Sequence, residues 1–125
     1  MKKTLDIQIG GNHYKKMPFQ PVELFAKTHC TAFQANIWKY ITRYKYKNGK
    51  EDIEKCKHYA QLAIALGCKG HISYKENKII ETFCEINNLS PAVSNIVKLA
   101  GFDLYAGVIK ACDSLLRIEY PVNQQ

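Results

Sequence analysis

The sequence predicts an all-α domain, or a mainly α domain with a short β element near its start. Two observations support this prediction: apolar residues recur at helical spacing along most of the chain, and helix-capping residues stand at the segment boundaries. A chain of 125 residues suffices for one domain that buries about two-thirds of the surface of its unfolded form. We therefore expect a single domain, 1–125, with about five to six helices.

The first half of the chain predicts three helices after an irregular or short-strand entry over residues 1–20. Pro21 suits the first position of a short helix that runs to about Thr28. Thr31 and Gln34 have the spacing of a capping box, which predicts a helix over about 32–46.

The next boundary lies at Asn48-Gly49, which is typical of a helix C-terminus. Glu51 and Asp52 follow it and favour the first turn of a new helix, because carboxylates stabilise the positive end of the helix dipole. This helix is expected to reach about Leu66 and to end at Gly67.

The second half predicts three further helical segments, over about 75–87, 91–100 and 104–118. Ser90 is expected to cap the second of these and Asp103 the third. The segment 71–125 offers no recognisable chemistry, and its apolar residues are expected to complete the core or to form a subunit interface. We expect a homo-oligomer, with a dimer as the minimum.

The net charge of +7 belongs to the first part of the chain. Residues 1–70 carry 13 Lys and Arg against five acids, whereas residues 71–125 carry five against six. A local excess of positive charge attracts anions, whether a polymer, a membrane surface or a small phosphate compound.

Export, membrane insertion and a disulfide framework are not expected. The longest apolar run, 60–68, is far shorter than the about 20 residues of a spanning helix, and polar residues follow Lys2-Lys3 where a signal peptide would be apolar. The five cysteines contain no C-x-x-C pair and fit a reducing cytoplasm. Cys56, Cys84 and Cys112 are expected to be small buried hydrophobes.

Candidate binding residues concentrate in 11–66. One helix face offers Asn36, Lys39, Arg43 and Lys47, three to four residues apart, and a tight turn would bring the polar face of the next helix beside it. The candidate ligand-binding residues are His13, Tyr14, Lys16, Gln20, Asn36, Lys39, Arg43, Lys47, Asp52, Lys55, His58 and Tyr59.

These residue types suit a phosphorylated nucleotide. Arginine pairs bidentately with phosphate, lysine neutralises charge, and tyrosine or histidine stacks on a base for about 1–3 kcal/mol. The competing interpretation is an ordinary solvated helix surface, with Tyr40 and Tyr44 in the core.

The same segment resembles a small bacteriophage family usually labelled SaV-like or nucleotide kinase-like, a domain of otherwise unknown function. The resemblance rests on His13-Tyr14, 17–21, 36–44, 47–52 and 57–59, with departures at Val22 and Ala35. It implies a virus-encoded protein in the cytoplasm of an infected bacterium. It also implies a ligand role for residues at the matching positions, namely His13, Tyr14, Gln20, Asn36, Lys39, Arg43, Asp52 and His58.

Three functions follow as hypotheses. The first is a phage protein that sequesters a nucleotide signal, cyclic or linear, and so blunts host defence without a cofactor. The second is a nucleoside monophosphate kinase that acts on deoxynucleotides and would need ATP and magnesium. The chain has no G-x-x-x-x-G-K-[ST] segment and few carboxylates that could share a metal. The third is a nucleic-acid-binding module, which ranks last because acids interrupt the basic stripe at 51–54. A zinc site has no ligand pair with suitable spacing.

Overall fold

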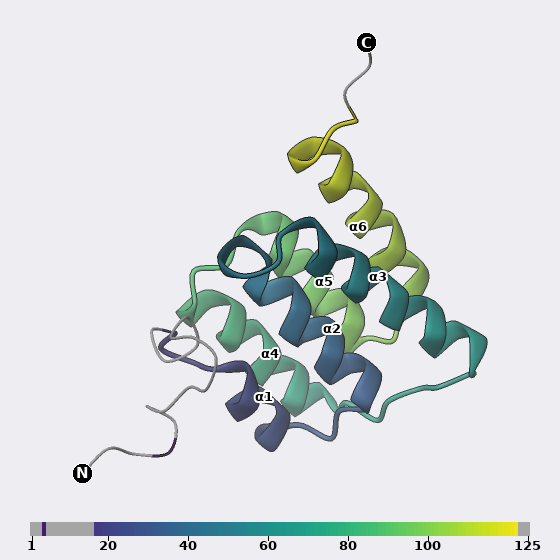
Figure 1. Cartoon of the computed structure of the whole chain (residues 1–125). Helices are drawn as coiled ribbons and strands as arrows, with labels where there is room; N and C mark the ends of the chain where they lie inside the picture. The colour runs from purple at the N-terminus through teal and green to yellow at the C-terminus, as the bar shows by residue number, and fades with distance from the viewer. Residues whose placement is uncertain (1–3, 5–16, 123–125) are drawn as a thin grey trace.

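The computed structural model describes residue 4 and residues 17–122. In order, their elements are α1 (Pro21–Lys27), α2 (Ala32–Arg43), the 3-10 helix η2 (Tyr44–Tyr46), α3 (Lys50–Ala65), α4 (Tyr74–Ile86), α5 (Pro91–Gly101) and α6 (Tyr105–Glu119) (Figure 1). The all-α prediction is confirmed. No described residue lies in a strand, so the N-terminal β element finds no support, and most of its expected residues lie outside the described part.

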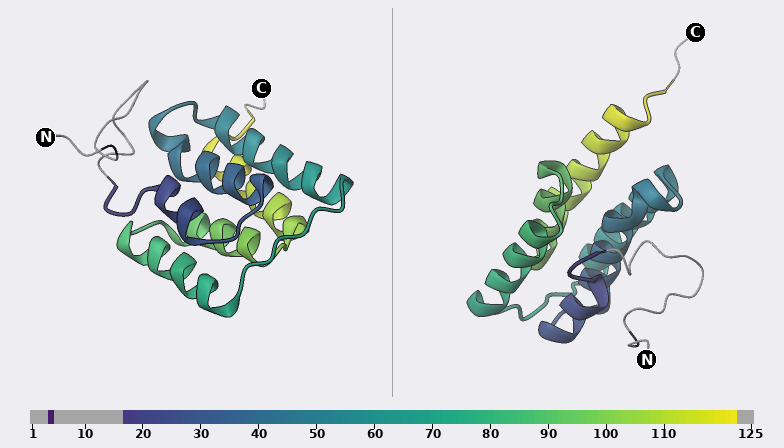
Figure 2. Two further views of the ribbon diagram at one scale, coloured as in Figure 1. Left: turned by 90° about the horizontal axis from the view of Figure 1, so that it is seen from below. Right: turned by 90° about the vertical axis from the view of Figure 1, so that its left-hand side faces the viewer.

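The six α-helices of this part of the chain form two layers. Figure 2 shows α1, α2 and α3 side by side in the first layer, and α4, α5 and α6 in the second. Across the interface, α1 packs on α4, α2 on α5 and α3 on α6. Each layer is continuous along the chain, since residues 21–65 form the first and residues 74–119 form the second.

Apolar side chains from both layers fill the space between them. Trp38 from α2 and Phe83 from α4 are the largest fully buried side chains. Complete burial of a side chain of this kind is worth about 1.5–3 kcal/mol. Cys56, Cys84 and Cys112 are buried among these residues with free thiols, as expected. None of the described helices has the length and apolar character required to cross a membrane.

Capping residues set the helix starts much as predicted. Pro21 occupies the first turn of α1. The Thr31 hydroxyl accepts a hydrogen bond from the Gln34 backbone N–H at 3.1 Å, and Gln34 Oε1 accepts one from the Thr31 backbone N–H at 2.9 Å. Ser90 caps α5 by accepting from the Val93 backbone N–H at 3.2 Å.

The prediction for the end of α2 is wrong by about one turn. The α-helix stops at Arg43 and tightens into η2, because the chain must reverse within 44–49 to begin α3. Gly49 makes this reversal at φ +55°, a left-handed conformation that side chains disfavour. A Cβ atom there would lie 2.9 Å from the Tyr120 hydroxyl, so the turn is also closely covered.

The predicted cap of α6 is also wrong. Leu104 is the N-cap residue, and the carboxylate of Asp103 points elsewhere. Asp103 Oδ1 accepts from the Gly70 backbone N–H at 2.9 Å, from the Tyr105 hydroxyl at 2.9 Å and from Gln34 Nε2 at 3.3 Å. This carboxylate therefore fastens the linker between the two layers and does not cap a helix.

Hydrogen bonds from α2 fix its position on α5. The Trp38 indole N–H donates to the Val97 carbonyl at 3.0 Å, and Gln34 Nε2 donates to the Ala100 carbonyl at 3.1 Å. Because a buried polar group without a partner costs about 1–3 kcal/mol, these bonds select one register of the two helices. The register in turn determines which side chains of α2 face α3.

Candidate functional site

The candidate site lies on α2 and α3, beside the turn that joins them (Figure 1). Arg43 is the last residue of α2 and is 7% exposed. Asp52 lies in the first turn of α3 and is fully buried. The guanidinium donates to Asp52 Oδ1 from Nη2 at 3.1 Å and from Nε at 3.3 Å. Asp52 Oδ2 accepts from the Asn48 backbone N–H at 3.1 Å, so one carboxylate holds both α2 and the turn.

Tyr40 stands at the centre of a group of cations one turn before Arg43. The Arg43 guanidinium carbon lies 4.6 Å from the centre of the Tyr40 ring. The ammonium groups of Lys39 and Lys55 each lie 5.3 Å from the same centre. The Tyr59 ring stacks on Tyr40 with centres 5.8 Å apart and an interplanar angle of 12°. We call these five residues the Tyr40 cluster.

The electron-rich face of the Tyr40 ring is what allows three cations to gather there. Such contacts are worth about 0.5–1 kcal/mol each at exposed sites. The carboxylate of Glu51 offers Lys55 only a loose pair at 3.9 Å. The cluster is therefore a half-buried, positively charged aromatic surface, with two ammonium groups close to the stacked rings.

Five of the candidate binding residues come together here. Lys39, Arg43, Lys55 and Tyr59 belong to the Tyr40 cluster, and Asp52 is paired with Arg43. Arg43 differs from the expectation, because its guanidinium is buried on Asp52 where a phosphate fork was predicted. It thus positions the helices, and its charge is compensated by the Asp52 carboxylate.

Other candidates serve local structure or stand apart. Gln20 is the N-cap of α1 and forms a capping box with Glu23. Asn36 is not directed at a pocket, because its Nδ2 donates to the Ala32 carbonyl one turn earlier at 2.8 Å. Lys47 lies in the exposed turn beyond the end of α2, so the predicted single face of four residues is wrong.

The remaining candidates are His58 and the N-terminal group. His58 is exposed on α3. His13, Tyr14 and Lys16 lie outside the described residues.

A hollow of about 240 Å³ lies beside η2, where the turn between α4 and α5 approaches the end of α2. Lys45 and Tyr46 contribute to its lining from η2, and Asn88 and Ser90 contribute from the facing turn. Its wall includes Tyr44, whose hydroxyl donates to Glu119 Oε1 at 2.9 Å. Burial, followed by this contact with a carboxylate, raises the pKa of the Tyr44 hydroxyl well above its ordinary value of 10.

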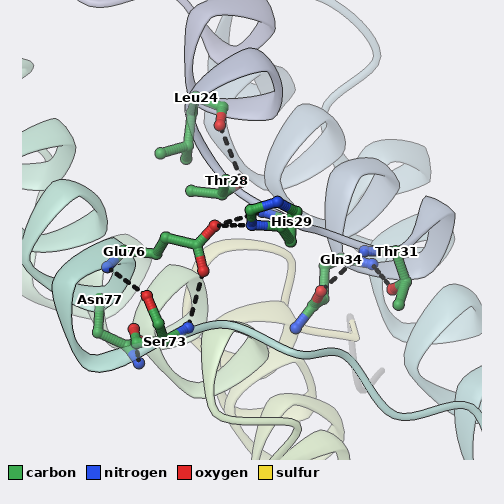
Figure 3. Close-up of polar contacts among 8 residues, drawn as sticks. All are labelled: Leu24, Thr28, His29, Thr31, Gln34, Ser73, Glu76 and Asn77. Atoms are coloured by element: carbon green, nitrogen blue, oxygen red, sulfur yellow. Dashed lines mark hydrogen bonds and ion pairs between the residues drawn. The ribbon is translucent and has the colours of Figure 1, made fainter.

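A second polar centre joins the connection between α1 and α2 to α4, and the sequence did not predict it (Figure 3). Glu76 Oε1 accepts from the His29 backbone N–H at 2.7 Å and lies 2.5 Å from His29 Nδ1. Glu76 Oε2 accepts from the Ser73 backbone N–H at 2.8 Å, which completes a capping box at the start of α4. The Ser73-x-x-Glu76 spacing signals the box, but nothing near it in the sequence signals His29.

These donors make Glu76 an unusually strong acid. The hydrogen bond from the Ser73 backbone, followed by those from His29, lowers the pKa of the carboxyl from 4.5 to about 2 against the opposing effect of burial. Its partner ring is 87% exposed. The pair therefore links the two layers, with the Glu76 carboxylate buried and the His29 ring exposed to solvent.

The sequence-based prediction omitted Tyr40 from the candidate site. Its position among apolar residues of α2 suggests a core role, and it does pack against the core. The signal that could have identified it is Arg43, three residues later on the same helix, which brings a cation near an aromatic ring at this position, whereas nothing local signals the approach of Lys55 from α3. Within the described residues, no three His, Cys, Asp or Glu side chains are placed to hold a metal ion.

Comparison with known proteins finds one family. Residues 10–61 are similar to the family described as "Protein of unknown function (DUF3310)", and the match covers α1, α2 and most of α3. No curated protein and no solved structure gives a significant match. The resemblance to a SaV-like or nucleotide kinase-like family is therefore wrong, because the matching family carries no such description.

Proposed function

We propose that the chain binds a phosphorylated nucleotide at the Tyr40 cluster and does not convert it. The observation that supports this is the gathering of Lys39, Arg43 and Lys55 around a tyrosine ring that is itself stacked on Tyr59. Aromatic rings bind bases and ammonium groups bind phosphates, and here both lie within one patch of α2 and α3.

The cluster divides these tasks among its residues. The buried ion pair of Arg43 and Asp52 holds the two helices at a fixed distance, which keeps the rings stacked. Lys39 and Lys55 have flexible side chains that can turn from the Tyr40 face to an arriving phosphate. The base would stack on the half-buried Tyr59 ring.

The role we propose for this binding is sequestration of a nucleotide signal, whether cyclic or linear. Binding without conversion lowers the free concentration of a ligand, and it needs only a complementary surface. The viral origin was implied by the family resemblance, which the comparison overturns, and the action against host defence was a hypothesis about the use of such binding. The proposal depends on neither.

Isothermal titration of the full chain tests the proposal. The probes are AMP, ADP, ATP and a cyclic dinucleotide, each at low salt. Lys39→Gln and Lys55→Gln should each weaken binding about 10- to 100-fold, since a hydrogen bond to a charged group is worth about 1.5–3 kcal/mol. Tyr59→Leu should weaken binding by a similar factor through lost stacking. Lys98→Gln, an exposed residue on α5 in the other layer, is the matched control.

Three results would contradict the proposal. The first is the absence of binding by every probe, and the second is equal loss in the Lys98→Gln control. The third is recovery of a chemically altered nucleotide, by mass spectrometry after incubation with and without magnesium, which would indicate an enzyme. Tighter binding of long single-stranded DNA than of any mononucleotide, with a steep salt dependence, would indicate a nucleic-acid-binding module instead.

Self-association of the chain stays a prediction. We propose that the chain forms at least a dimer in solution. Light scattering at working concentration tests this, and a monomer mass would contradict it.

A further inference from the structure

An open groove of about 540 Å³ runs between α1 and α4, away from the Tyr40 cluster. Three of its lining residues are lysines, two are large apolar side chains and the sixth is an exposed threonine. They are Phe19, Lys27, Lys75, Lys78, Ile79 and Thr82.

The lysines lie at one end of this groove. Lys75 and Lys78 belong to the first turns of α4, which begins at Tyr74. Lys27 is the last residue of α1, and the chain contacts the start of α4 two residues later through His29. Two of the three lysines thus lie in the first turns of α4, and the third lies at the end of α1, which the contact between His29 and Glu76 ties to the start of α4.

The opposite end of the groove is apolar, and hydrogen bonds fix the position of its main side chain. Asn87, the C-cap of α4, accepts from the Phe19 backbone N–H at 3.2 Å and donates to the Phe19 carbonyl at 2.7 Å. The Phe19 ring meets Phe83 edge to face, with centres 5.1 Å apart. Phe19 is thus held at the C-terminal end of α4, and Ile79 and Thr82 continue its surface toward the lysines.

The lysines have only weak ties within the described residues. Lys78 Nζ lies 3.5 Å from Glu81 Oε2, and both side chains are about half exposed. It also lies 5.2 Å from the centre of the exposed Tyr74 ring. Exposed pairs of this kind are worth about 0–1 kcal/mol and exchange readily for another anion.

We propose that this groove binds an anionic amphiphile of medium chain length. The carboxylate or phosphate head pairs with the cluster of three lysines, and the alkyl tail lies over Phe19 and Ile79. The charge of the groove is complementary to such a head only at one end, which gives the ligand a direction. This site is separate from the proposed nucleotide site, and either can fail without the other.

Calorimetry with straight-chain probes below their micelle concentrations tests the proposal. The probes are octanoate, decanoate, decyl phosphate and the neutral control decanol. Decanoate should bind about 4- to 16-fold more tightly than octanoate, because each buried methylene gives up to about fourfold in affinity. Decanoate and decyl phosphate should both bind more tightly than decanol, since the alcohol lacks the charge that the lysines recognise.

Variants separate the two ends of the site. The double change Lys75→Gln and Lys78→Gln should weaken decanoate about 3- to 30-fold and leave decanol unchanged. Thr82→Asp places a carboxylate beside the tail, at an exposed position of α4, and should weaken the binding of both decanoate and decanol. Lys110→Gln, exposed on α6, is the matched control, and circular dichroism checks that each variant is folded.

The proposal is overturned if decanoate does not bind, if octanoate binds equally well, or if the two lysine changes have no more effect than Lys110→Gln. Binding to vesicles of an anionic phospholipid without any binding of free decanoate would also overturn it, because that result indicates attraction to a membrane surface. A nucleotide that competes with decanoate would show that the two sites are not separate.

Discussion

In the first layer, α2 and α3 are joined by a buried ion pair and a tight turn, whereas α4, α5 and α6 in the second layer pack mainly through apolar side chains. The described part of the chain contains five buried polar or charged residues, and four of them, namely Gln34, Thr42, Arg43 and Asp52, lie in the first layer. The fifth, Glu76, lies in α4 but binds His29 of the first layer. The matched family covers mostly this polar layer.

The difference has a physical consequence for function. Apolar packing is tolerant of small shifts, whereas a buried ion pair or amide keeps its energy only in one geometry. The first layer can therefore hold the Tyr40 cluster at fixed spacing, and the second layer supplies the apolar support behind it. Four substitutions test this contrast between polar and apolar support.

The largest effect is expected from Asp52→Ala. It leaves the Arg43 guanidinium buried without its carboxylate, so the free energy of unfolding should fall by about 3–5 kcal/mol. Urea unfolding followed by fluorescence of Trp38, the one tryptophan, measures this. The double change of Arg43→Leu with Asp52→Leu should cost much less than Asp52→Ala, and an equal cost would show that charge pairing does not hold the turn.

A smaller loss is expected from Gln34→Leu. The new side chain keeps the volume but removes the amide that donates to the Ala100 carbonyl and that accepts from the Thr31 backbone N–H, which should cost about 1–3 kcal/mol. The measurement is again urea unfolding. Gln61→Leu, an exposed position on α3, should stay within about 0.5 kcal/mol, and a similar loss in both would refute the role of the buried amide.

The contact between Glu76 and His29, which links the two layers, predicts that stability depends on pH. Because folding lowers the pKa of Glu76 from 4.5 to about 2, its contribution is complete above pH 4.5 and is lost as the pH falls through about 2. The wild-type protein should lose about 1–2 kcal/mol from this group over that window. Glu76→Gln keeps a capping-box side chain without the charge, so its stability should change less between these pH values. Parallel profiles of stability against pH for the two proteins would show that the Glu76 carboxylate does not stabilise the contact between the layers.

The smallest effect is expected at Lys57 and Asp113, a pair that also joins the layers. Their atoms lie 2.7 Å apart, but the two side chains are 30% and 37% exposed. Asp113→Ala should cost no more than about 1 kcal/mol, because water screens the pair. A loss as large as that of Asp52→Ala would show that burial does not explain the difference between the two ion pairs.

Local patterns predicted much of the fold. The Thr31 and Ser90 caps and the proline at the start of α1 are confirmed, because capping depends on residues only three apart. The charge imbalance placed the basic residues in 1–70, and polar residues at helical spacing placed the candidate site in 11–66, the segment that contains the Tyr40 cluster. The end of α2 was misplaced because the turn to α3 is set by contacts across the chain, such as the one between Gly49 and Tyr120.

The sequence by itself therefore determined the helices, the buried cysteines and the segment that carries the basic residues, since all of these follow from spacing along the chain. Only the tertiary structure decided what those residues do. It turned Arg43 inward onto Asp52, placed Tyr40 among cations, and joined His29 to Glu76 over 47 positions. Such pairings depend on which helices become neighbours, and this depends on how both apolar faces pack together.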